Sequence, residues 1–454
     1  MKRCLSIGAS LLFIVSCSDD GPQMTSETAS ESSSDSDPNG DGDGDPATAS
    51  GDGDGDDPST TDGDGDGDDP STTNGDGDGD DPPPDPELEP QTFTRVTPAP
   101  EGGEVRVAHC AVDPTGNIYV AWMQSVGDAV DIYISSSTDG GQSFGAPVAI
   151  EDGPDTPTGG SLYARKPYVA TDGERVAVAY GAVGPNYTGV RISTGLEPLS
   201  FGPLVEVGTP DAEDFEDFPK AVFSPEGEVW VSWHWTVPGV SEAKMVSREG
   251  EGWVAEDVSG DAPGLPCECC PHDIRVNAAG DTLLAYRNNI DNLRDHWVAR
   301  DVGSSSGFST PVLGSGTAWM IPACPVSGPR LSETAGGRQL LVWADPTSGA
   351  SRVWIASSDD GGASWGDDAL VFDGDEGQAL PAITTAADGR VLVAYAAGSQ
   401  GRLTGSLDEG QSFVPPFSVD TEDGPLARIE LCSGATLTGM VGVTPANSLW
   451  WAGD

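Results

Sequence analysis

The sequence predicts an all-β propeller built from four-stranded blades, and three observations lead to this fold class. From about residue 91 onward, short runs rich in β-branched and aromatic residues alternate with Gly, Asp and Pro. One of these runs returns at a spacing of about 45 to 55 residues, which is typical of propeller blades. Spare strands at the two ends of this region would together complete one further blade.

The repeating unit begins near residues 104, 164, 217, 270, 323 and 379. Its second strand is the clearest element and alternates with period two. The six copies read NIYVAWMQ, RVAVAYGA, EVWVSWHW, DTLLAYRN, RQLLVWAD and RVLVAYAA. A first strand precedes each copy and is often opened by proline, as in KPYVATDG and LPAITTAADG, and a third and a fourth strand follow.

Residues left over at both ends favour seven blades. The C-terminal stretch LARIELCSGATLTGMVGVTPANSLWWAG supplies three strands, and QTFTRV at 91–96 stands unassigned before the first unit. A seventh blade made of these four strands would close the ring and protect its sheet edges. The alternative is a six-bladed ring followed by a C-terminal extension.

The first sixteen residues predict export. Lys2 and Arg3 precede an apolar segment, Leu5–Val15, which is too short for a permanent transmembrane helix but typical of a signal peptide. The sequence Ile14–Cys17 resembles a lipoprotein lipobox, which implies cleavage after residue 16 and lipidation of Cys17. The alternative is an ordinary signal peptide. Because no aspartate follows Cys17, we expect an outer-membrane or surface location.

Residues 17–90 predict a disordered acidic tether rich in Gly, Asp, Pro, Ser and Thr. Residues 18–90 contain no Lys or Arg, carry 25 acidic residues and repeat the unit GDGDGDDPSTT. Such a segment has too little apolar surface to fold and is extended by its own charge. Its Asp-Gly alternation suggests weak Ca²⁺ binding as an alternative role, although no Glu stands at the twelfth position of an EF-hand loop.

The charge balance restricts the partners. The chain has 74 acidic and 21 basic residues, for a net charge of −53. This excess disfavours nucleic acid and anionic lipid surfaces as ligands. We therefore expect a monomer that meets the membrane only through its lipid anchor and binds a glycan or another polar extracellular ligand through the domain at 91–454.

Three turns between third and fourth strands share one motif. They read STDGGQSF, SDDGGASW and SLDEGQSF, and their shared positions are Ser137, Asp139, Gly141, Phe144, Ser358, Asp360, Gly362, Trp365, Ser406, Asp408, Gly410 and Phe413. In such a turn the Asp and Ser oxygens accept backbone amides, and glycine takes the left-handed conformation. The motif resembles the Asp-box, or BNR repeat, of the sialidase superfamily.

The resemblance covers about 91–454 and implies a sialidase-like propeller with exo-α-sialidase-type glycosidase activity. It also implies that the Asp-boxes are structural, because in that family they lie away from the ligand face. The family's catalytic set is three arginines, a Tyr–Glu pair and an aspartate. This chain lacks the family's early Arg-Ile-Pro motif, and RKP at 165–167 is only a distant echo of it.

The ligand face of a propeller is formed by loops that enter the inner strands and loops that join second to third strands. In blades two to five these loops carry Arg, Asp, His, Tyr and Trp, a combination that suits a glycan. For hydrolysis, we predict Asp217 or Asp295 as acid/base and Arg165, Arg287 and Arg294 as anion clamps. One alternative is a non-catalytic binding propeller. For the single residues, the alternative is that Arg294 and Asp295 pair with each other or with loop amides and that Trp233 and Trp235 belong to the core.

Six cysteines remain after Cys4 and Cys17, which predicts three disulfides in an oxidising compartment. Cys110 and Cys432 follow the same R-x-x-x-C spacing on the first and last inner strands, so we expect them to bond across the ring closure. The other four should cluster, with their pairing left open: Cys267, Cys269, Cys270 and Cys324. The alternatives are a copper or zinc site at these four, with His272 or His109, and redox-active thiols. We expect no other cofactor.

Overall fold

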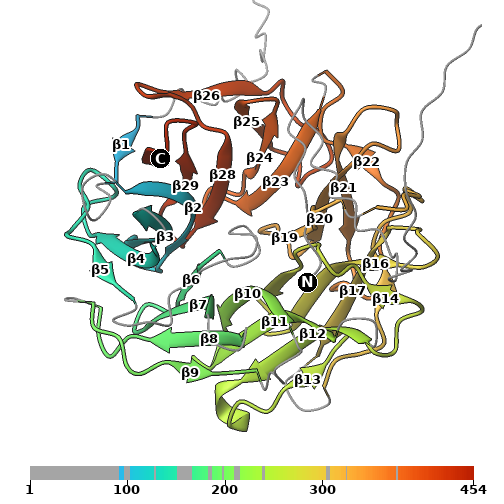
Figure 1. Cartoon of the computed structure of the whole chain (residues 1–454). Coiled ribbons are helices and arrows are strands. Elements are labelled where there is room, and N and C mark those ends of the chain that lie inside the picture. The colour runs from blue at the N-terminus through green and yellow to red at the C-terminus, as the bar shows by residue number, and fades with distance from the viewer. Residues whose placement is uncertain are drawn as a thin grey trace, which may run out of the picture. The chain divides into compact units, whose positions relative to one another are not determined.

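The computed structural model describes residues 92–96, 103–126, 129–150, 166–182, 187–196, 199–208, 215–237, 241–302, 307–323, 325–374 and 377–453. These residues form seven antiparallel sheets arranged around a central axis (Figure 1). The prediction of an all-β propeller, with seven blades in preference to six, is therefore confirmed. The predicted signal peptide, Cys17 and the tether at 17–90 lie outside the described residues, as do Arg165 and Cys324.

The first four blades follow the chain from inner to outer strand. Their strands are β2 (Glu104–Val112), β3 (Ile118–Val126), β4 (Ala129–Ser137) and β5 (Val148–Ala149); β6 (Tyr168–Thr171), β7 (Val176–Ala182), β8 (Tyr187–Ile192) and β9 (Val205–Glu206); β10 (Phe215–Phe223), β11 (Val229–Val237), β12 (Ser241–Arg248) and β13 (Glu256–Asp257); and β14 (Leu265–Pro266), β15 (Asp273–Val276), β16 (Thr282–Asn289), β17 (His296–Asp301) and β18 (Val312–Leu313). In blade four, β14 and β15 both pair with β16.

The last three blades complete the ring. Their strands are β19 (Arg330–Glu333), β20 (Gln339–Asp345), β21 (Arg352–Ser358) and β22 (Ala369–Leu370); β23 (Gln378–Thr385), β24 (Val391–Ala397), β25 (Gln400–Ser406), β26 (Phe417–Thr421) and β27 (Gly424–Pro425); and β28 (Arg428–Ser433), β29 (Thr438–Val443), β30 (Leu449–Gly453) and β1 (Thr94–Arg95). A single 3-10 turn, η1 (Glu249–Glu251), follows β12. Among the described residues, no helix has the length and hydropathy needed to cross a bilayer.

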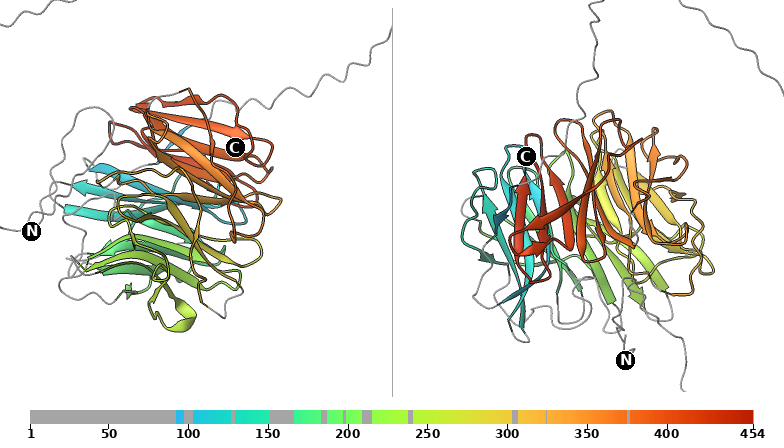
Figure 2. Two further views of the ribbon diagram at one scale, coloured as in Figure 1. Left: turned by 90° about the vertical axis from the view of Figure 1, so that its right-hand side faces the viewer. Right: turned by 90° about the horizontal axis from the view of Figure 1, so that it is seen from above.

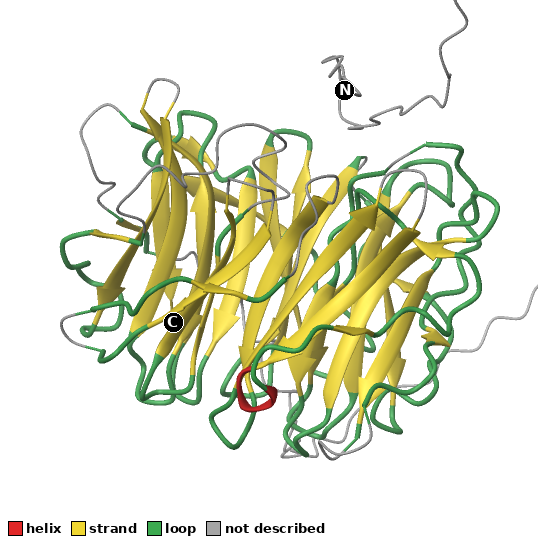
Figure 3. Cartoon of the chain, turned by 60° about the horizontal axis from the view of Figure 1, so that its bottom comes forward, coloured by secondary structure: helices red, strands yellow, loops and turns green. Residues whose placement is uncertain are grey.

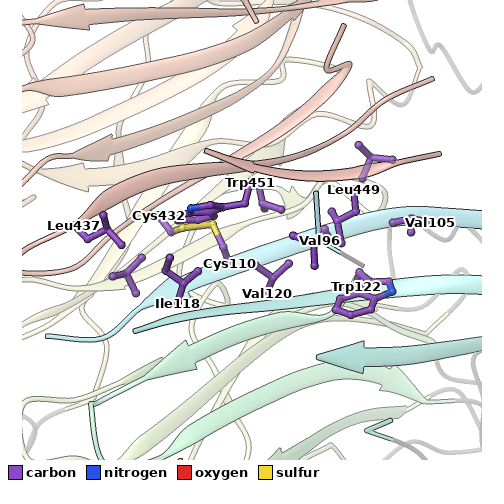
Figure 4. Packing of buried hydrophobic residues seen from close by; sticks show 14 residues of the cluster. Val96, Val105, Cys110, Ile118, Val120, Trp122, Cys432, Leu437, Leu449 and Trp451 are labelled. Atoms are coloured by element: carbon purple, nitrogen blue, oxygen red, sulfur yellow. A yellow bond between two sulfur atoms is a disulfide. The ribbon is translucent and has the colours of Figure 1, made fainter. Parts of the chain in front are cut away.

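The seventh blade closes the ring as predicted. Its order is β1-β30-β29-β28, with Thr94 opposite Trp451 and Arg95 opposite Trp450. Beside this closure, a disulfide joins Cys110 of β2 to Cys432 of β28, with 5.9 Å between their Cα atoms. Figure 4 shows the bond within a buried apolar cluster that includes Trp122. The predicted Cys110–Cys432 pairing is thus confirmed.

The core lies between neighbouring blades. Because each sheet is covered on both faces, the second strands are buried almost throughout, and every residue of β20 is buried. Period-two alternation is typical of sheets with one wet face, which these central strands do not have. Apolar clusters fill each blade boundary, and Trp233 belongs to the cluster between blades two and three.

The two ends of the propeller differ (Figures 2 and 3). At the end that we name the turn end, first strands connect to second strands and third strands to fourth strands, so that Val112, Ile118 and Ser137 lie in register. At the entry end, inner strands begin and second strands connect to third strands. The three turns with the shared motif lie at the turn end.

Each of these turns is built by one aspartate. The Ser364 hydroxyl donates to Asp360 Oδ2 at 2.6 Å, and Asp360 Oδ1 accepts both the Ser364 N–H at 2.9 Å and the Ser358 hydroxyl at 2.8 Å. The Gly362 N–H then donates to the Ser358 hydroxyl, and Gly362 has a φ of 88°. Asp139 and Asp408 organise their turns in the same way.

Candidate functional site

One register position on the inner strands lines the axis. In each blade, a hairpin turn joins the first strand to the second, and a backbone N–H at the end of the first strand closes this turn. The position lies four residues before the residue that donates this N–H. From blade one to blade seven, this position holds His109, Tyr168, Lys220, Asp273, Arg330, Ala382 and Glu430. We name its six polar members, together with Lys166, the axial ring. Five of them line a cavity of about 300 Å³ on the axis: His109, Tyr168, Asp273, Arg330 and Glu430.

Ion pairs connect the ring across blades. The Glu430 carboxylate accepts from Lys166 and, at 3.2 Å, from Arg330. Lys220 pairs with Asp273, whose second oxygen accepts the Leu331 N–H at 2.8 Å. The side chains of these five ring members are only 5 to 17% exposed. Cations therefore outnumber carboxylates in a partly desolvated space.

An aromatic pair completes the ring. The rings of His109 and Tyr168 lie 3.6 Å apart between centroids, and the Lys220 ammonium lies 4.7 Å from the centre of Tyr168. The Val169 N–H donates to His109 Nδ1, so the neutral imidazole carries its proton on Nε2. Burial, with the charge of Lys166 added, holds the pKa of His109 well below its usual value.

The titration of the ring follows from burial and from its own charges. Burial, together with Arg330, lowers the pKa of Lys220 to about 7. Burial also lowers the pKa of Lys166 to about 8, although Glu430 opposes this shift. Burial raises the pKa of Tyr168, which stays a phenol. Burial alone would raise the pKa of Glu430, but Arg330 and Lys166 hold it well below its usual range.

Arg287, a predicted anion clamp, lies in the protein wall. Its side chain is fully buried and donates to the backbone carbonyls of Arg294 at 2.7 Å, Ser327 at 3.0 Å and Ala344 at 3.1 Å. The guanidinium also lies over Trp319, at 5.0 Å. These contacts brace the loops of blades four and five against each other.

The other predicted residues are distributed over the entry end. Arg294 donates to the Ile321 carbonyl at 3.4 Å, and Asp295 accepts the Ala318 N–H at 2.9 Å. Burial raises the pKa of Asp295. Asp217 is half-buried near the start of β10, opposite His234. The structure places none of these residues at the axial-ring position, and their catalytic roles stay predictions.

Sequence reasoning missed the axial ring, although a signal for it exists. The sequence predicts the first strands, but the prediction of site residues considers the loops around these strands and not the strands themselves. Counting back from each hairpin turn places His109, Tyr168, Lys220, Asp273, Arg330 and Glu430 in one column. A column of charged residues on strands that are otherwise apolar predicts an axial site.

A second polar site surrounds the cysteines at the entry end. The sulfur atoms of Cys267, Cys269 and Cys270 all lie within 4.8 Å of one another. Cys269 is disulfide-bonded, whereas Cys267 and Cys270 are thiols whose sulfurs are 2.6 Å apart. The prediction of three disulfides is wrong for Cys267 and Cys270, which are free thiols, and the clustering of all four cysteines is not tested because Cys324 lies outside the described residues. A metal here stays a prediction, and it would need Cys269 to leave its disulfide.

The two thiols have different surroundings. Burial raises the pKa of Cys270. Burial also opposes ionisation of Cys267, but a hydrogen bond from Cys270 and the charges of Arg294 and Arg287 outweigh it and lower the pKa of Cys267 to about 6. The Lys244 ammonium is fully buried beside them and donates to the Cys270 carbonyl at 3.0 Å.

Comparison with known proteins finds likeness only among solved structures. No family model and no curated protein matches this chain. A Hadza microbial sialidase is 14% identical, with a TM-score of 0.43 over 74% of this chain and 76% of that chain. A protein of unknown function from Dyadobacter fermentans is 11% identical, with a TM-score of 0.47 over 80% and 98%. A polysaccharide lyase described as an ulvan lyase is 12% identical, with a TM-score of 0.47 over 74% and 91%. At these values the likeness concerns the blade arrangement alone.

Proposed function

We propose that this chain is an exported lipoprotein whose propeller binds an acidic glycan, with a carboxylate or sulfate of the sugar held at the axial ring. In this proposal Cys17 carries the lipid, and residues 17–90 hold the propeller away from the membrane. The observation that supports the proposal most directly is the excess of cations on the axis of a strongly acidic chain.

The charge argument is specific to the axis. Lys and Arg make up only 21 of 454 residues, yet Arg330 lines the axial cavity, and Lys166 and Lys220 pair with Glu430 and Asp273, two carboxylates that line it. Arg275 lines the same cavity two residues beyond Asp273, and its Nε is buried without a partner among the described residues. Buried charges are costly unless they are paired, so a surplus of cations favours an anionic ligand.

The size of the cavity limits what enters. About 300 Å³ is at the small end of ligand pockets, which suits one or two sugar rings rather than a long chain. Tyr168 and His109 add hydrogen-bonding groups and an aromatic face to the charges. A terminal acidic sugar, or one acidic residue of a polymer, fits this combination.

A second candidate function is turnover of the same ligand by elimination. Lys220, with a pKa of about 7, is a suitable base for the proton beside a sugar carboxylate, and Tyr168, a phenol, is a suitable acid for the departing glycosidic oxygen. Lys166 and Arg330 would neutralise the carboxylate. A carbon–carbon double bond forms as the carbon–oxygen bond breaks, so no water is consumed.

Hydrolysis is less well served by the ring. It needs a protonated carboxylic acid beside the scissile bond. Both ring carboxylates are paired with cations, and Glu430 is held ionised. A hydrolase of the sialidase type would therefore depend on Asp217 or Asp295, outside the ring.

The test is binding and turnover by the exported chain on matched acidic and neutral glycans. We expect acidic glycans to bind and Lys166→Gln to weaken them at least about tenfold, since Glu430 keeps Arg330 as a partner in this variant. Arg300→Gln is the matched control, because Arg300 bonds the Asp360 carbonyl at the turn end. Equal binding of neutral and acidic glycans, or equal loss in both variants, would refute the proposal. Ultraviolet absorbance of a new double bond separates elimination from hydrolysis.

A further inference from the structure

The cysteine turn at the start of blade four is not used by the axial ring and carries chemistry of its own. Cys267 and Cys270 stand three residues apart, and their sulfurs are 2.6 Å apart. This is only about 0.5 Å longer than a disulfide bond. The spacing and the contact together describe a dithiol that closes with little movement.

The backbone holds this turn independently of the sulfurs. The Cys270 N–H donates to the Cys267 carbonyl at 3.4 Å, which brings the two residues together. The Cys267 N–H donates to the Arg287 carbonyl at 2.8 Å, and the Cys270 carbonyl accepts from Lys244. Strands β16 and β12 thus fix the two ends of the turn, so the same fold accommodates the open and the closed pair.

Three buried cations next to the two sulfurs stabilise the reduced, dithiol form of the pair. A structural disulfide usually lacks such surroundings. Lys244, Arg287 and Arg294 all act on the two sulfurs electrostatically. Thiolates formed on reduction are stabilised by such charges, and a disulfide whose reduced form is stabilised is reduced more easily.

The surroundings of this dithiol also differ from those of the Cys110–Cys432 disulfide. Cys267 and Cys270 are buried, with Val326 packed against them, but Glu268 between them is exposed and Cys269 is half-buried, so the turn itself lies at the surface. Cys110–Cys432 instead lies inside the cluster between blades one and seven and joins residues 322 positions apart. Both of its cysteines line the axial cavity, so the expected difference between the two pairs rests on the stability of each S–S bond and not on access alone.

We propose that Cys267 and Cys270 form a reversible redox pair, oxidised by a small external disulfide and reduced by an external thiol. In the oxidation, the Cys267 thiolate attacks the external disulfide and releases one thiolate. The Cys270 thiol, on losing its proton, attacks the mixed disulfide and releases the second thiolate. The chain gives up two electrons and one S–S bond replaces another. This inference does not depend on the ligand of the axial ring.

The pair lies close enough to strand β15 along the chain for its redox state to affect the axial ring. After Cys270 and Pro271 comes His272, whose Nε2 bonds the Ser232 hydroxyl at 2.8 Å, and then Asp273 of the axial ring. Strand β15 therefore begins three residues from the redox pair. Opening the pair is expected to increase amide hydrogen exchange in residues 273–276.

The test is a redox titration of the full exported chain in glutathione buffers, with acid quenching, differential alkylation and peptide mass spectrometry. We expect Cys267 and Cys270 to become labelled together, at a value of [GSH]²/[GSSG] at least about tenfold lower than Cys110 and Cys432. Labelling of both thiols in every buffer would show permanent thiols and overturn the proposal. Opening only together with Cys110–Cys432, on unfolding, would show a plain staple and overturn it too.

The Cys267→Ser variant tests whether Cys270 pairs with Cys267 or instead exchanges into the disulfide of Cys269. In Cys267→Ser, we expect Cys270 to be labelled or glutathionylated in all buffers, while Cys269 stays protected and Cys110–Cys432 is unchanged. Labelling of Cys269 in this variant would mean that Cys270 pairs with it instead, against the proposal. If the variant folds poorly, the wild-type titration still decides.

Discussion

Lys220 of β10 forms an ion pair with Asp273 of β15 across the boundary between blades three and four, and neither side chain is more than 7% exposed. The pair couples two inner strands at the level of the axial ring. Because both charges are desolvated, each depends on the other, and on Tyr168 and Leu331 beside them.

Removing one partner should destabilise the fold more than removing both. We expect Asp273→Leu to lower the free energy of unfolding by about 3–5 kcal/mol, because Lys220 is left buried and uncompensated. The double variant with Lys220→Met should recover most of this loss. Urea unfolding of the four proteins in the cycle measures the coupling. Additive losses would show that the pair is already solvated.

Binding of an acidic glycan should weaken as pH rises above 7 to 8, because Lys220 and Lys166 lose their charge there. The affinity should fall by at most about tenfold per pH unit for each lysine. Calorimetric titrations between pH 5.5 and 9 measure this, and Lys220→Met should flatten the lower part of the profile. An affinity independent of pH would contradict the proposed contact.

Stability should change in the opposite sense over the same range. The pKa of Lys220 is about 7 in the folded chain and about 10.4 when unfolded, so the unfolded chain binds more protons between these values. The free energy of unfolding therefore rises with pH in this window, by at most about 1.4 kcal/mol per unit. Comparing urea midpoints of wild type and Lys220→Met across this window isolates the effect.

Opening the Cys110–Cys432 bond should destabilise the closed ring strongly. The chain-entropy model gives about 5 kcal/mol for so long a loop, as an upper value, because β1 still pairs with β30 in the reduced chain. Cys110→Ser with Cys432→Ser, compared with wild type in urea, measures the loss. Unchanged midpoints would mean that the blade-seven ladder closes the ring alone.

A substitution in one of the turns with the shared motif should affect only the structure of that turn. Asp360→Ala removes the acceptor of the Ser358 and Ser364 hydrogen bonds, so amide exchange should increase at 358–366. Ligand affinity should not change, because Asp360 and the other residues of its turn do not line the axial cavity. Asp360→Asn is the matched control and should keep part of the protection. A loss of affinity in Asp360→Ala would give the turn a functional role.

Much of the architecture could be predicted because propeller blades repeat. The leftover strand at 91–96 and the matched positions of Cys110 and Cys432 follow from register, and the structure confirms both. Pro219 and Pro381 do not open their strands as expected but lie inside β10 and β23, at a register shift. The inner-strand residues of the axial ring also share one register position. This can be seen in the sequence only after all the first strands are aligned on the hairpin turns that follow them.

The candidate site was harder to predict than the fold because charge type does not reveal the partner. Arg287 and Lys220 are both basic residues. Arg287 donates only to carbonyl oxygens and a hydroxyl, whereas Lys220 pairs with Asp273 on the axis. The C-x-x-C spacing of Cys267 and Cys270 permits a thiol contact, but the turn is also held by Lys244, and the spacing does not indicate that interaction.

The closure of blade seven also sets how the propeller would respond to force. A pull on the chain ahead of residue 92 reaches the ring through β1, whose ladder with β30 has only two paired residues. Under load this strand would peel away first. The pull would then fall on β2, which is held covalently to β28 by Cys110–Cys432. A weak ladder backed by a covalent bond would let the propeller yield at its edge while its axis stays intact.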